Sequence, residues 1–225
     1  MIISHRHKFI FIKTRKTAGT SIELMLSRLC GPDDIITPLG MEDKFRPTVE
    51  TGAPRNFNIP LKFYSKTELL KRVLYRREYK EHHVASDLVN RVDPDVWASY
   101  YKFAFDRNPF DKVVSYYYWR SGHQQFRDIR RWIDSGGVDW LNSFDAYSIN
   151  NRVVVDKVFK YEKLDSSLEE LTLRLGLNHR LKMPEYKAKG TQRQKTGYRD
   201  LIDHDTRRLL EVMYARELAY LQYSF

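Results

Sequence analysis

The sequence contains 225 residues, of which 42% are hydrophobic and 14% aromatic, a composition that excludes a disordered chain and is sufficient for one well-buried domain. Its 39 Lys and Arg against 29 Asp and Glu give a formal net charge of +10. This charge favours nucleotides, nucleic acid, anionic glycans or a lipid surface as partners, and a basic surface that only keeps the protein soluble is an equal alternative. The single cysteine, Cys30, excludes an intrachain disulfide and a Cys-rich zinc site, and we expect a packed thiol.

The first predicted element is a short buried strand, Phe9–Ile12, because four consecutive apolar residues are typical of a strand covered on both faces. A polar turn over Lys13–Thr20 follows, and apolar residues at three- and four-residue spacing then predict a helix over Ser21–Leu29. A signal sequence needs roughly 7–15 apolar residues and a membrane span about 20. The run Phe9–Ile12 is shorter than either, so we expect a cytoplasmic protein without a membrane span.

The middle of the chain contains a loop-rich excursion and a second strand–turn–helix unit. Residues 31–65 hold most of the prolines, which predicts irregular structure, and a helix with a basic face is expected over Lys66–Lys80. A strand is then predicted over Tyr100–Phe105 and a helix over Phe110–Arg120. Asn108 is suited to cap the start of that helix, because its side chain can accept a hydrogen bond from the first turn.

The remaining predicted elements are a strand over Val153–Tyr161, a helix over Ser166–Leu175 and a last helix over Asp205–Leu221. Strands that alternate with helices predict an α/β fold of three layers, with a mostly parallel central sheet flanked by helices. We expect a single domain over residues 1–225. Ligands bind such sheets at the carboxyl ends of the strands, where both polar turns fall.

The turn after the first strand has the composition of an anion-binding loop. The free N–H groups and the dipole at the start of the following helix favour a phosphate or sulfate, and cations and hydroxyls add further donors. A Walker A loop is excluded because its lysine follows the glycines, whereas Lys16 precedes Gly19. The candidate anion ligands are Arg15, Lys16, Thr17, Ala18, Gly19, Thr20 and Ser21.

The turn after the second strand contains a second candidate phosphate site. Arg107 leaves the strand and Ser115 lies two turns into the next helix, so both can face one phosphate; a structural pairing of Arg107 with Asp106 or Asp111 is the alternative. The order Lys-Thr-Ala-Gly-Thr-Ser in the first turn resembles the 5′-phosphosulfate loop of sulfotransferases that use 3′-phosphoadenosine-5′-phosphosulfate (PAPS). Arg-Asn-Pro followed by Asp-Lys-Val-Val-Ser looks like their 3′-phosphate segment. The resemblance implies a P-loop-like sulfotransferase fold, with Lys16 at the oxygen that bridges phosphate and sulfate.

A third similarity concerns the acceptor side of the site. Residues 81–88, Glu-His-His-Val-Ala-Ser-Asp-Leu, are similar to a His-x-x-Ala-x-x-Leu element of small bacterial-type members that are grouped with carbohydrate 2-O-sulfotransferases. The resemblance implies a histidine that acts as a base on the acceptor. His82 has the matching spacing to Ala85 and Leu88, and His83 is the second candidate. The sequence departs from the family at Arg15, where many members have proline.

The resemblance implies transfer of the sulfuryl group of PAPS to a hydroxyl or amine of a small-molecule or glycan acceptor, without a metal ion and without nucleic acid as a partner. Residues 31–65 are then expected on the acceptor side, and the basic segment Lys187–Arg199 is either a lid over the nucleotide or a solvated loop. Two rival functions stay open: a P-loop-type nucleotide kinase or NTPase, and a non-enzymatic nucleic-acid-binding protein. Mg²⁺-dependent ATP turnover would identify the first, and strongly salt-dependent binding to DNA or RNA the second.

Overall fold

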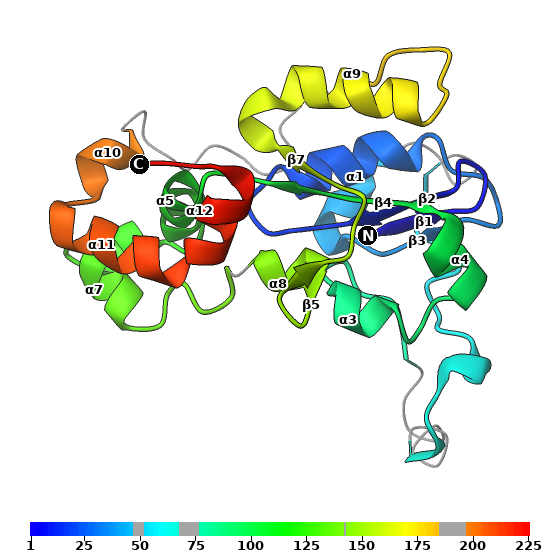
Figure 1. Cartoon of the computed structure of the whole chain (residues 1–225), viewed down its shortest axis with the longest axis horizontal. Helices are drawn as coiled ribbons and strands as arrows, with labels where there is room; N and C mark the ends of the chain where they lie inside the picture. The colour runs from blue at the N-terminus through cyan, green and yellow to red at the C-terminus, as the bar shows by residue number, and fades with distance from the viewer. Residues whose placement is uncertain (47–51, 68–76, 142, 185–196) are drawn as a thin grey trace.

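A five-stranded sheet forms the centre of the protein (Figure 1). The computed structural model describes residues 1–46, 52–67, 77–141, 143–184 and 197–225. The strands lie side by side in the order β3-β1-β2-β4-β7. In chain order they are β1 (Ile2–Ser4), β2 (Phe9–Ile12), β3 (Ile35–Ile36), β4 (Tyr101–Asp106) and β7 (Lys157–Lys160).

All strands of this sheet except β1 run in the same direction. β2 pairs in parallel with β4, and β4 with β7, so Ile12 lies beside Ala104 and Ala104 beside Val158. β1 runs antiparallel to both of its neighbours, β2 and β3. The prediction of a mostly parallel sheet therefore holds for the direction of the strands, but the pairing is mixed. β1 and β3 were not predicted because three and two residues are too few to show a periodic pattern.

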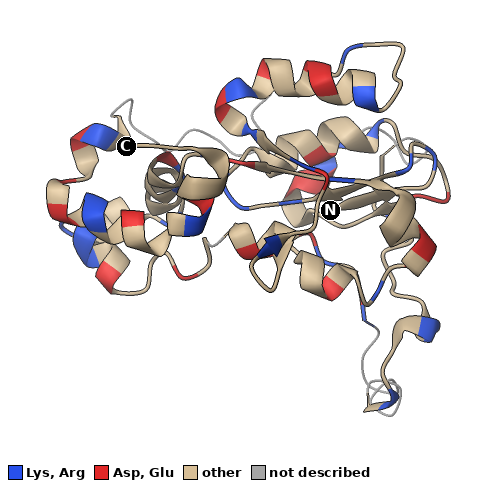
Figure 2. Ribbon diagram, viewed as in Figure 1, with Lys and Arg blue, Asp and Glu red and all other residues tan. Residues whose placement is uncertain are grey.

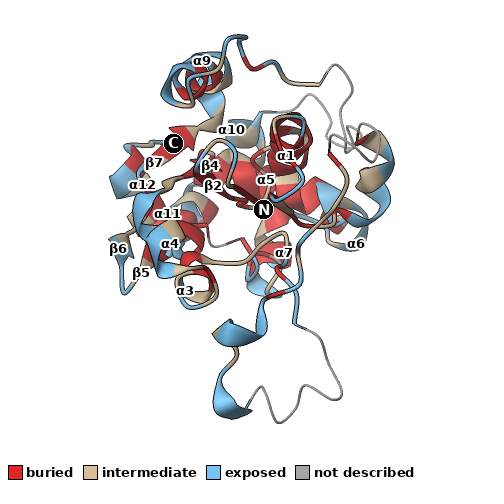
Figure 3. Ribbon diagram, turned by 90° about the vertical axis from the view of Figure 1, so that its right-hand side faces the viewer, coloured by how far each residue is buried: buried red, intermediate tan, exposed pale blue. Residues whose placement is uncertain are grey.

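Successive side chains of β2 and β4 belong alternately to two apolar clusters, one on each face of the sheet, because neighbouring residues of a strand point to opposite faces. One face packs against α1 (Gly19–Ser27) and α9 (Leu164–Arg174) through a cluster that includes Phe9, Phe11, Phe103, Phe105, Ile22 and Leu168. The other face packs against α3 (Ala85–Leu88) and α8 (Phe144–Tyr147) through Ile10, Ile12, Ala104, Leu88 and Tyr147. Figure 3 shows the buried residues concentrated along the sheet between these helices, which confirms a central sheet flanked by helices.

A group of helices lies beyond the carboxyl end of β4 (Figure 1). Its central member is α5 (Pro109–Trp119), which begins directly after β4 and whose first turn is capped by Asn108: the side chain accepts from the N–H of Phe110 (3.0 Å). The aromatic run of α5 is buried up to Tyr118, as core residues should be, and packs with Trp132 and Tyr214. The other helices of the group are α6 (Gly122–Gln125), α7 (Ile129–Asp134), α10 (Tyr198–Leu201), α11 (His204–Met213) and α12 (Ala215–Leu221).

The remaining described elements are short. Within 31–65 the described residues form only β3 and two 3₁₀ turns, in line with the predicted loop-rich excursion. Among the described residues the 3₁₀ turns are η1 (Gly40–Phe45), η2 (Leu61–Phe63) and η3 (Tyr161–Lys163). The others are α4 (Pro94–Ser99) and a two-stranded sheet of β5 (Ser148–Ile149) and β6 (Arg152–Val153).

The predicted strand over Val153–Tyr161 is wrong in its extent. Val153 belongs to β6, where it pairs with Ser148, and β7 begins only at Lys157. The break lies at Asp156, whose N–H donates to the carbonyl of Lys102 (2.8 Å) and whose carboxylate accepts from the N–H of Lys102 (2.7 Å). These two bonds start the pairing of β7 with β4, which a one-dimensional apolar pattern does not reveal.

The predicted last helix is also divided. The chain departs from helical geometry at the buried Tyr214, with φ of −111°, so that α11 and α12 are separate helices. Helix α1 starts at Gly19, two residues before the predicted start at Ser21. Most of the predicted helix Lys66–Lys80 and most of the segment Lys187–Arg199 lie outside the described residues.

Cys30 has the surroundings expected from the sequence, and the described charged residues are distributed over several elements. The Cys30 thiol is buried behind α1, burial raises its pKa, and it donates to the carbonyl of Leu26 (3.5 Å), as a packed thiol would. Figure 2 shows Lys and Arg interspersed with Asp and Glu, so the positive charge is not gathered on one of the described helices.

A buried ion pair joins the end of β4 to α5. Asp106 and Lys112 are both fully buried, and the Lys112 ammonium lies 3.0 Å from the Asp106 carboxylate. Lys112 also donates to the hydroxyl of Ser143 (2.9 Å), and Asp106 accepts from the hydroxyl of Tyr147 (2.9 Å). Asp106 and Lys112 therefore neutralise each other's charge. Their hydrogen bonds connect β4, α5 and α8.

Replacing Lys112 with Met should lower the free energy of unfolding by about 3–5 kcal/mol, because it leaves the Asp106 carboxylate buried without its counter-charge. Urea denaturation monitored by tryptophan fluorescence measures the loss. The control is Lys157→Met, which breaks an exposed pair with Glu170 (2.8 Å) and should cost less than about 1 kcal/mol. Equal losses in the two variants would contradict the assignment of Lys112 as a structural ion.

Candidate active site at the carboxyl ends of β2 and β4

The loop after β2 is tied to the end of β4 by its own hydroxyl groups. The hydroxyl of Thr14 donates to the carbonyl of Phe105, and Thr17 therefore donates to the hydroxyl of Thr14 (2.9 Å). Thr17 is 1% exposed, so its side chain is engaged inside the loop. The Thr17 hydroxyl, which the sequence suggested as a donor to an anion, is therefore bonded within the loop.

The backbone of this loop turns sharply before the helix begins. Lys16 and Ala18 both have left-handed conformations, with φ of 61° and 57°, which are uncommon for residues other than glycine and cluster at functional sites. The first hydrogen bond of α1 runs from the N–H of Ile22 to the carbonyl of Ala18 (3.0 Å). The N–H groups ahead of it point out of the helix end, where they can bind an anion; they belong to Gly19, Thr20 and Ser21.

Arg107, from the second predicted phosphate motif, contacts the loop that contains the first. Its guanidinium donates to the carbonyl of Lys16 (3.3 Å) and to the carboxylate of Asp111 (2.7 Å from Nε). The same guanidinium lies over the ring of Tyr161, 4.6 Å from its centroid. These contacts hold a half-buried cation beside the loop and orient its planar donor group.

Ser115 shares one face of α5 with two residues that contact the cations of the site. Asp111, Ser115 and Trp119 follow one another at four-residue spacing, so they form one stripe along α5. Arg107 is bound to Asp111, and the Lys16 ammonium lies over the ring of Trp119, 5.2 Å from its centroid. Ser115 itself is half-buried, and its role as a phosphate ligand stays a prediction.

His82 contacts the same loop through its imidazole ring. Its Nδ1 lies 3.0 Å from the carbonyl oxygen of Lys13. Because a carbonyl oxygen only accepts, Nδ1 carries the proton, and Nε2 presents its lone pair. Burial, assisted by the charge of Lys13, lowers the pKa of His82 to about 4, whereas the nearby Glu81 opposes this change. The imidazole is therefore neutral at pH 7.

His83 has different surroundings. Its Nδ1 accepts from the backbone N–H of Lys80 (3.3 Å), and its ring meets the edge of Tyr79. Burial lowers its pKa as well. The structure thus brings His82 to the loop after β2 and leaves His83 within its local turn, so the two candidate bases have different surroundings.

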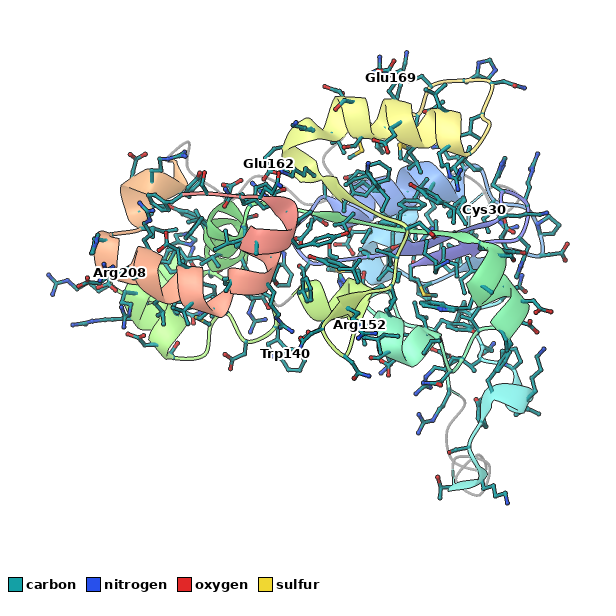
Figure 4. All side chains as sticks on the ribbon, viewed as in Figure 1. Cys30, Trp140, Arg152, Glu162, Glu169 and Arg208 are labelled. Atoms are coloured by element: carbon teal, nitrogen blue, oxygen red, sulfur yellow. The ribbon has the colours of Figure 1, made fainter. Side chains whose placement is uncertain are left out.

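Two supporting contacts were missed by the sequence. Glu162, labelled in Figure 4, accepts from the N–H of Asn108 (2.8 Å) and from the hydroxyl of Tyr223 (2.5 Å), which joins the end of β7 to the start of α5. Trp119 is 40% exposed, and the Lys16 ammonium lies over its ring. Each of these contacts joins segments that are distant in the sequence.

Other kinds of site were searched for in the same part of the chain. The described residues hold no group of three or more His, Cys, Asp or Glu that could share a metal ion. Among the described helices, none has the length and apolar character required to cross a membrane.

Comparison with known proteins shows the family of this chain. Residues 1–136, which include the turns after β2 and β4 and also His82, match the sulfotransferase family, and the chain belongs to that family. It is also similar to an uncharacterized protein of Archaeoglobus fulgidus, with 31% identity over 97 residues that cover 41% of this chain and 81% of the relative. The family match supports sulfotransfer as the general activity.

The imidazole of His82 should remain neutral down to about pH 5, whereas a free histidine becomes half protonated near pH 6.5. NMR titration of the imidazole carbons measures this directly, with His82→Gln to assign the signal. Because the pKa is lower in the folded than in the unfolded protein, the stability due to His82 is complete above about pH 6.5 and falls as the pH drops towards 4. His82→Gln should remove that part of the pH dependence; a His82 signal that titrates near pH 6.5 would contradict the burial argument.

Proposed function

We propose that this protein is a PAPS-dependent sulfotransferase that transfers the sulfuryl group to a hydroxyl or amine acceptor, with a carbohydrate as the preferred acceptor class. The observation that carries the proposal is the contact between the two phosphate motifs, in which Arg107 donates to the carbonyl of Lys16. Membership of the sulfotransferase family supports the reaction type. PAPS has a 5′-phosphosulfate and a 3′-phosphate, and the two motifs supply one cationic site for each.

The donor set fits both anionic groups of PAPS. The start of α1 offers N–H groups and the dipole of the helix, and Lys16 offers an ammonium beside them, which suits the 5′-phosphosulfate. Arg107 offers a planar donor group that is already oriented by Asp111, and Ser115 lies one turn further along α5; both suit the 3′-phosphate. Preorganised donors of this kind reduce the cost of ordering the site when the nucleotide binds.

The reaction that follows is an in-line displacement at sulfur. The acceptor oxygen forms a bond to sulfur while the bond from sulfur to the bridging oxygen breaks, and the proton of the acceptor goes to Nε2 of His82. The products are the sulfated acceptor and 3′-phosphoadenosine-5′-phosphate. Lys16 stabilises the negative charge that develops on the bridging oxygen. The neutral His82 is in the correct state to accept the proton, and the anionic donor beside it raises its basicity.

The acceptor is proposed to approach from the side of residues 31–65 and His82. The elements on which the resemblance to carbohydrate 2-O-sulfotransferases rests lie on this side. Arg15 and Lys13 add positive charge near the imidazole. A polyhydroxylated acceptor that carries acidic groups suits this environment better than an apolar one. A panel of glycans and phenols tests the choice, and a clear preference for hydrophobic phenols would exclude the carbohydrate assignment.

Arg107→Ala should weaken the binding of 3′-phosphoadenosine-5′-phosphate by about 10- to 100-fold, the effect expected for the loss of a charge-assisted contact to phosphate. Isothermal titration calorimetry with this nucleotide, and with AMP and ATP for comparison, measures the change. Arg130→Ala is the matched control, since Arg130 forms the same type of pair, with Asp134 four residues later, on the exposed face of α7. Equal binding of AMP and the bisphosphate by the wild type would refute the proposed donor.

Lys16→Met should lower the turnover of labelled PAPS by about 100- to 1,000-fold, because the charge on the bridging oxygen develops only during transfer. Binding of the bisphosphate product, which lacks the sulfuryl group, should weaken far less. Transfer of the label from PAPS to the glycans of the panel, with release of labelled sulfate when water is the acceptor, provides the assay. A variant that keeps full turnover, or one that loses product binding as strongly as turnover, would contradict this role of Lys16.

A further inference from the structure

Lys13 is a buried cation at the point where β2 ends and the anion-binding loop begins. Its side chain is 2% exposed, and its ammonium lies 3.2 Å from the carboxylate of Glu23 and 2.5 Å from that of Glu81. Its backbone carbonyl accepts from Nδ1 of His82. Lys13 therefore contacts both the carboxylate of Glu81, which precedes His82 in the sequence, and the imidazole of His82.

The loop packs directly on the stem of this side chain. A Cβ atom at Gly19 would lie 2.8 Å from Cγ of Lys13 and 3.2 Å from the carbonyl oxygen of Thr14, so only glycine allows this approach. The position of the Lys13 side chain is thus coupled to the start of α1. A movement of Lys13 would disturb the N–H groups that are proposed to bind the phosphosulfate.

Glu23 anchors the other side of the ammonium. Burial would raise the pKa of Glu23, but the α-amino group of Met1, Lys13 and Arg46 together lower it, so the carboxylate stays ionised. It also accepts from Arg46 (3.3 Å) and from the hydroxyl of Thr37 (3.1 Å). Because Glu23 has these other partners, removal of the Lys13 charge does not leave it unpaired in the interior.

We propose that Lys13 is a positioning residue for His82: its ammonium, held between Glu23 and Glu81, and its carbonyl together fix the orientation and tautomer in which Nε2 faces the acceptor. The inference rests on the proposed role of His82 as the base. It assigns Lys13, at the end of β2, to the acceptor half of the site, although Arg15 and Lys16 follow it closely in the sequence.

The charged groups near the imidazole allow a test, because removal of a positive or a negative neighbour should shift the pKa of His82 in opposite directions. These groups are Lys13 at the end of β2, Arg15 in the loop and Glu81 beside the ring, whose carboxylate lies 3.7 Å from Nε2. Lys13→Met removes a positive neighbour and also releases Glu81 from its lysine partner, so the pKa of His82 should rise by about one pH unit. Glu81→Gln removes the negative neighbour, so the pKa should fall.

The experiment is NMR titration of His82 in the wild type and in Lys13→Met, Glu81→Gln and Lys13→Arg, with kcat and KM measured for the same proteins. Lys13→Arg keeps the charge and should stay close to the wild type. The matched control is Lys102→Met, because Lys102 is another buried strand lysine, paired with Asp156 (3.2 Å) at the opposite end of the sheet. It should leave the His82 titration unchanged. In Lys13→Met the acidic limb of kcat/KM should move upward together with the pKa, while the KM for PAPS changes less than about threefold.

Opposite shifts in Lys13→Met and Glu81→Gln support the proposal, whereas no shift, or shifts of the same sign, would overturn it. If Lys13→Met does not fold, the half-exposed Glu81→Gln and the charge-conserving Lys13→Arg decide the result in the same way. The titration needs no ligand, so it is independent of the donor assignment. Failure of the wild type to bind the bisphosphate would refute the proposed function and leave the measured coupling between Lys13 and His82 in place.

Discussion

Parallel pairing of β2 with β4 is the constraint on which the site depends. It aligns Ile12 with Ala104, so the two strands end at the same edge and the turns that follow them meet. The Thr14 hydroxyl, which donates to the carbonyl of Phe105, fastens the first turn to the second strand at that edge. A shift of the register by one residue would exchange the two faces of the strand and separate the turns, so the hydrophobic core itself maintains the distance between them.

Buried charges define the geometry around this edge. Burial of an ion is unfavourable unless a partner compensates it, so each buried cation has a fixed position relative to its carboxylate. Lys112 is held by Asp106 at the end of β4, and Lys13 is held by Glu23 at the end of β2. The two strand ends from which the turns leave are therefore each held by a buried ion pair.

Arg107 and Lys16 have different surroundings. Arg107 is oriented by the Asp111 carboxylate and the Tyr161 ring, and the Lys16 ammonium lies over the ring of Trp119. A cation–π contact at a half-exposed position is worth roughly 0.5–1 kcal/mol, which is weak compared with attraction to a phosphosulfate group. If PAPS binds as proposed, this contact leaves the Lys16 ammonium able to turn towards the bridging oxygen.

The sequence by itself determined the two strand–turn–helix units, because apolar runs, the Asn108 cap and helical spacing are local signals that tertiary packing reinforces here. It also identified the cations and the glycine of the loop, and the family match confirms the family they indicated. Tertiary structure alone decided the rest. β1 and β3 exist only through pairing with β2 and with each other, and Val153 left the predicted strand because Asp156 bonds to Lys102. The two histidines are adjacent in sequence, and the sequence favoured His82 only through its spacing to Ala85 and Leu88. Tertiary structure shows the contact of His82 with the carbonyl of Lys13, 69 residues away along the chain, and no local pattern encodes a contact of that range.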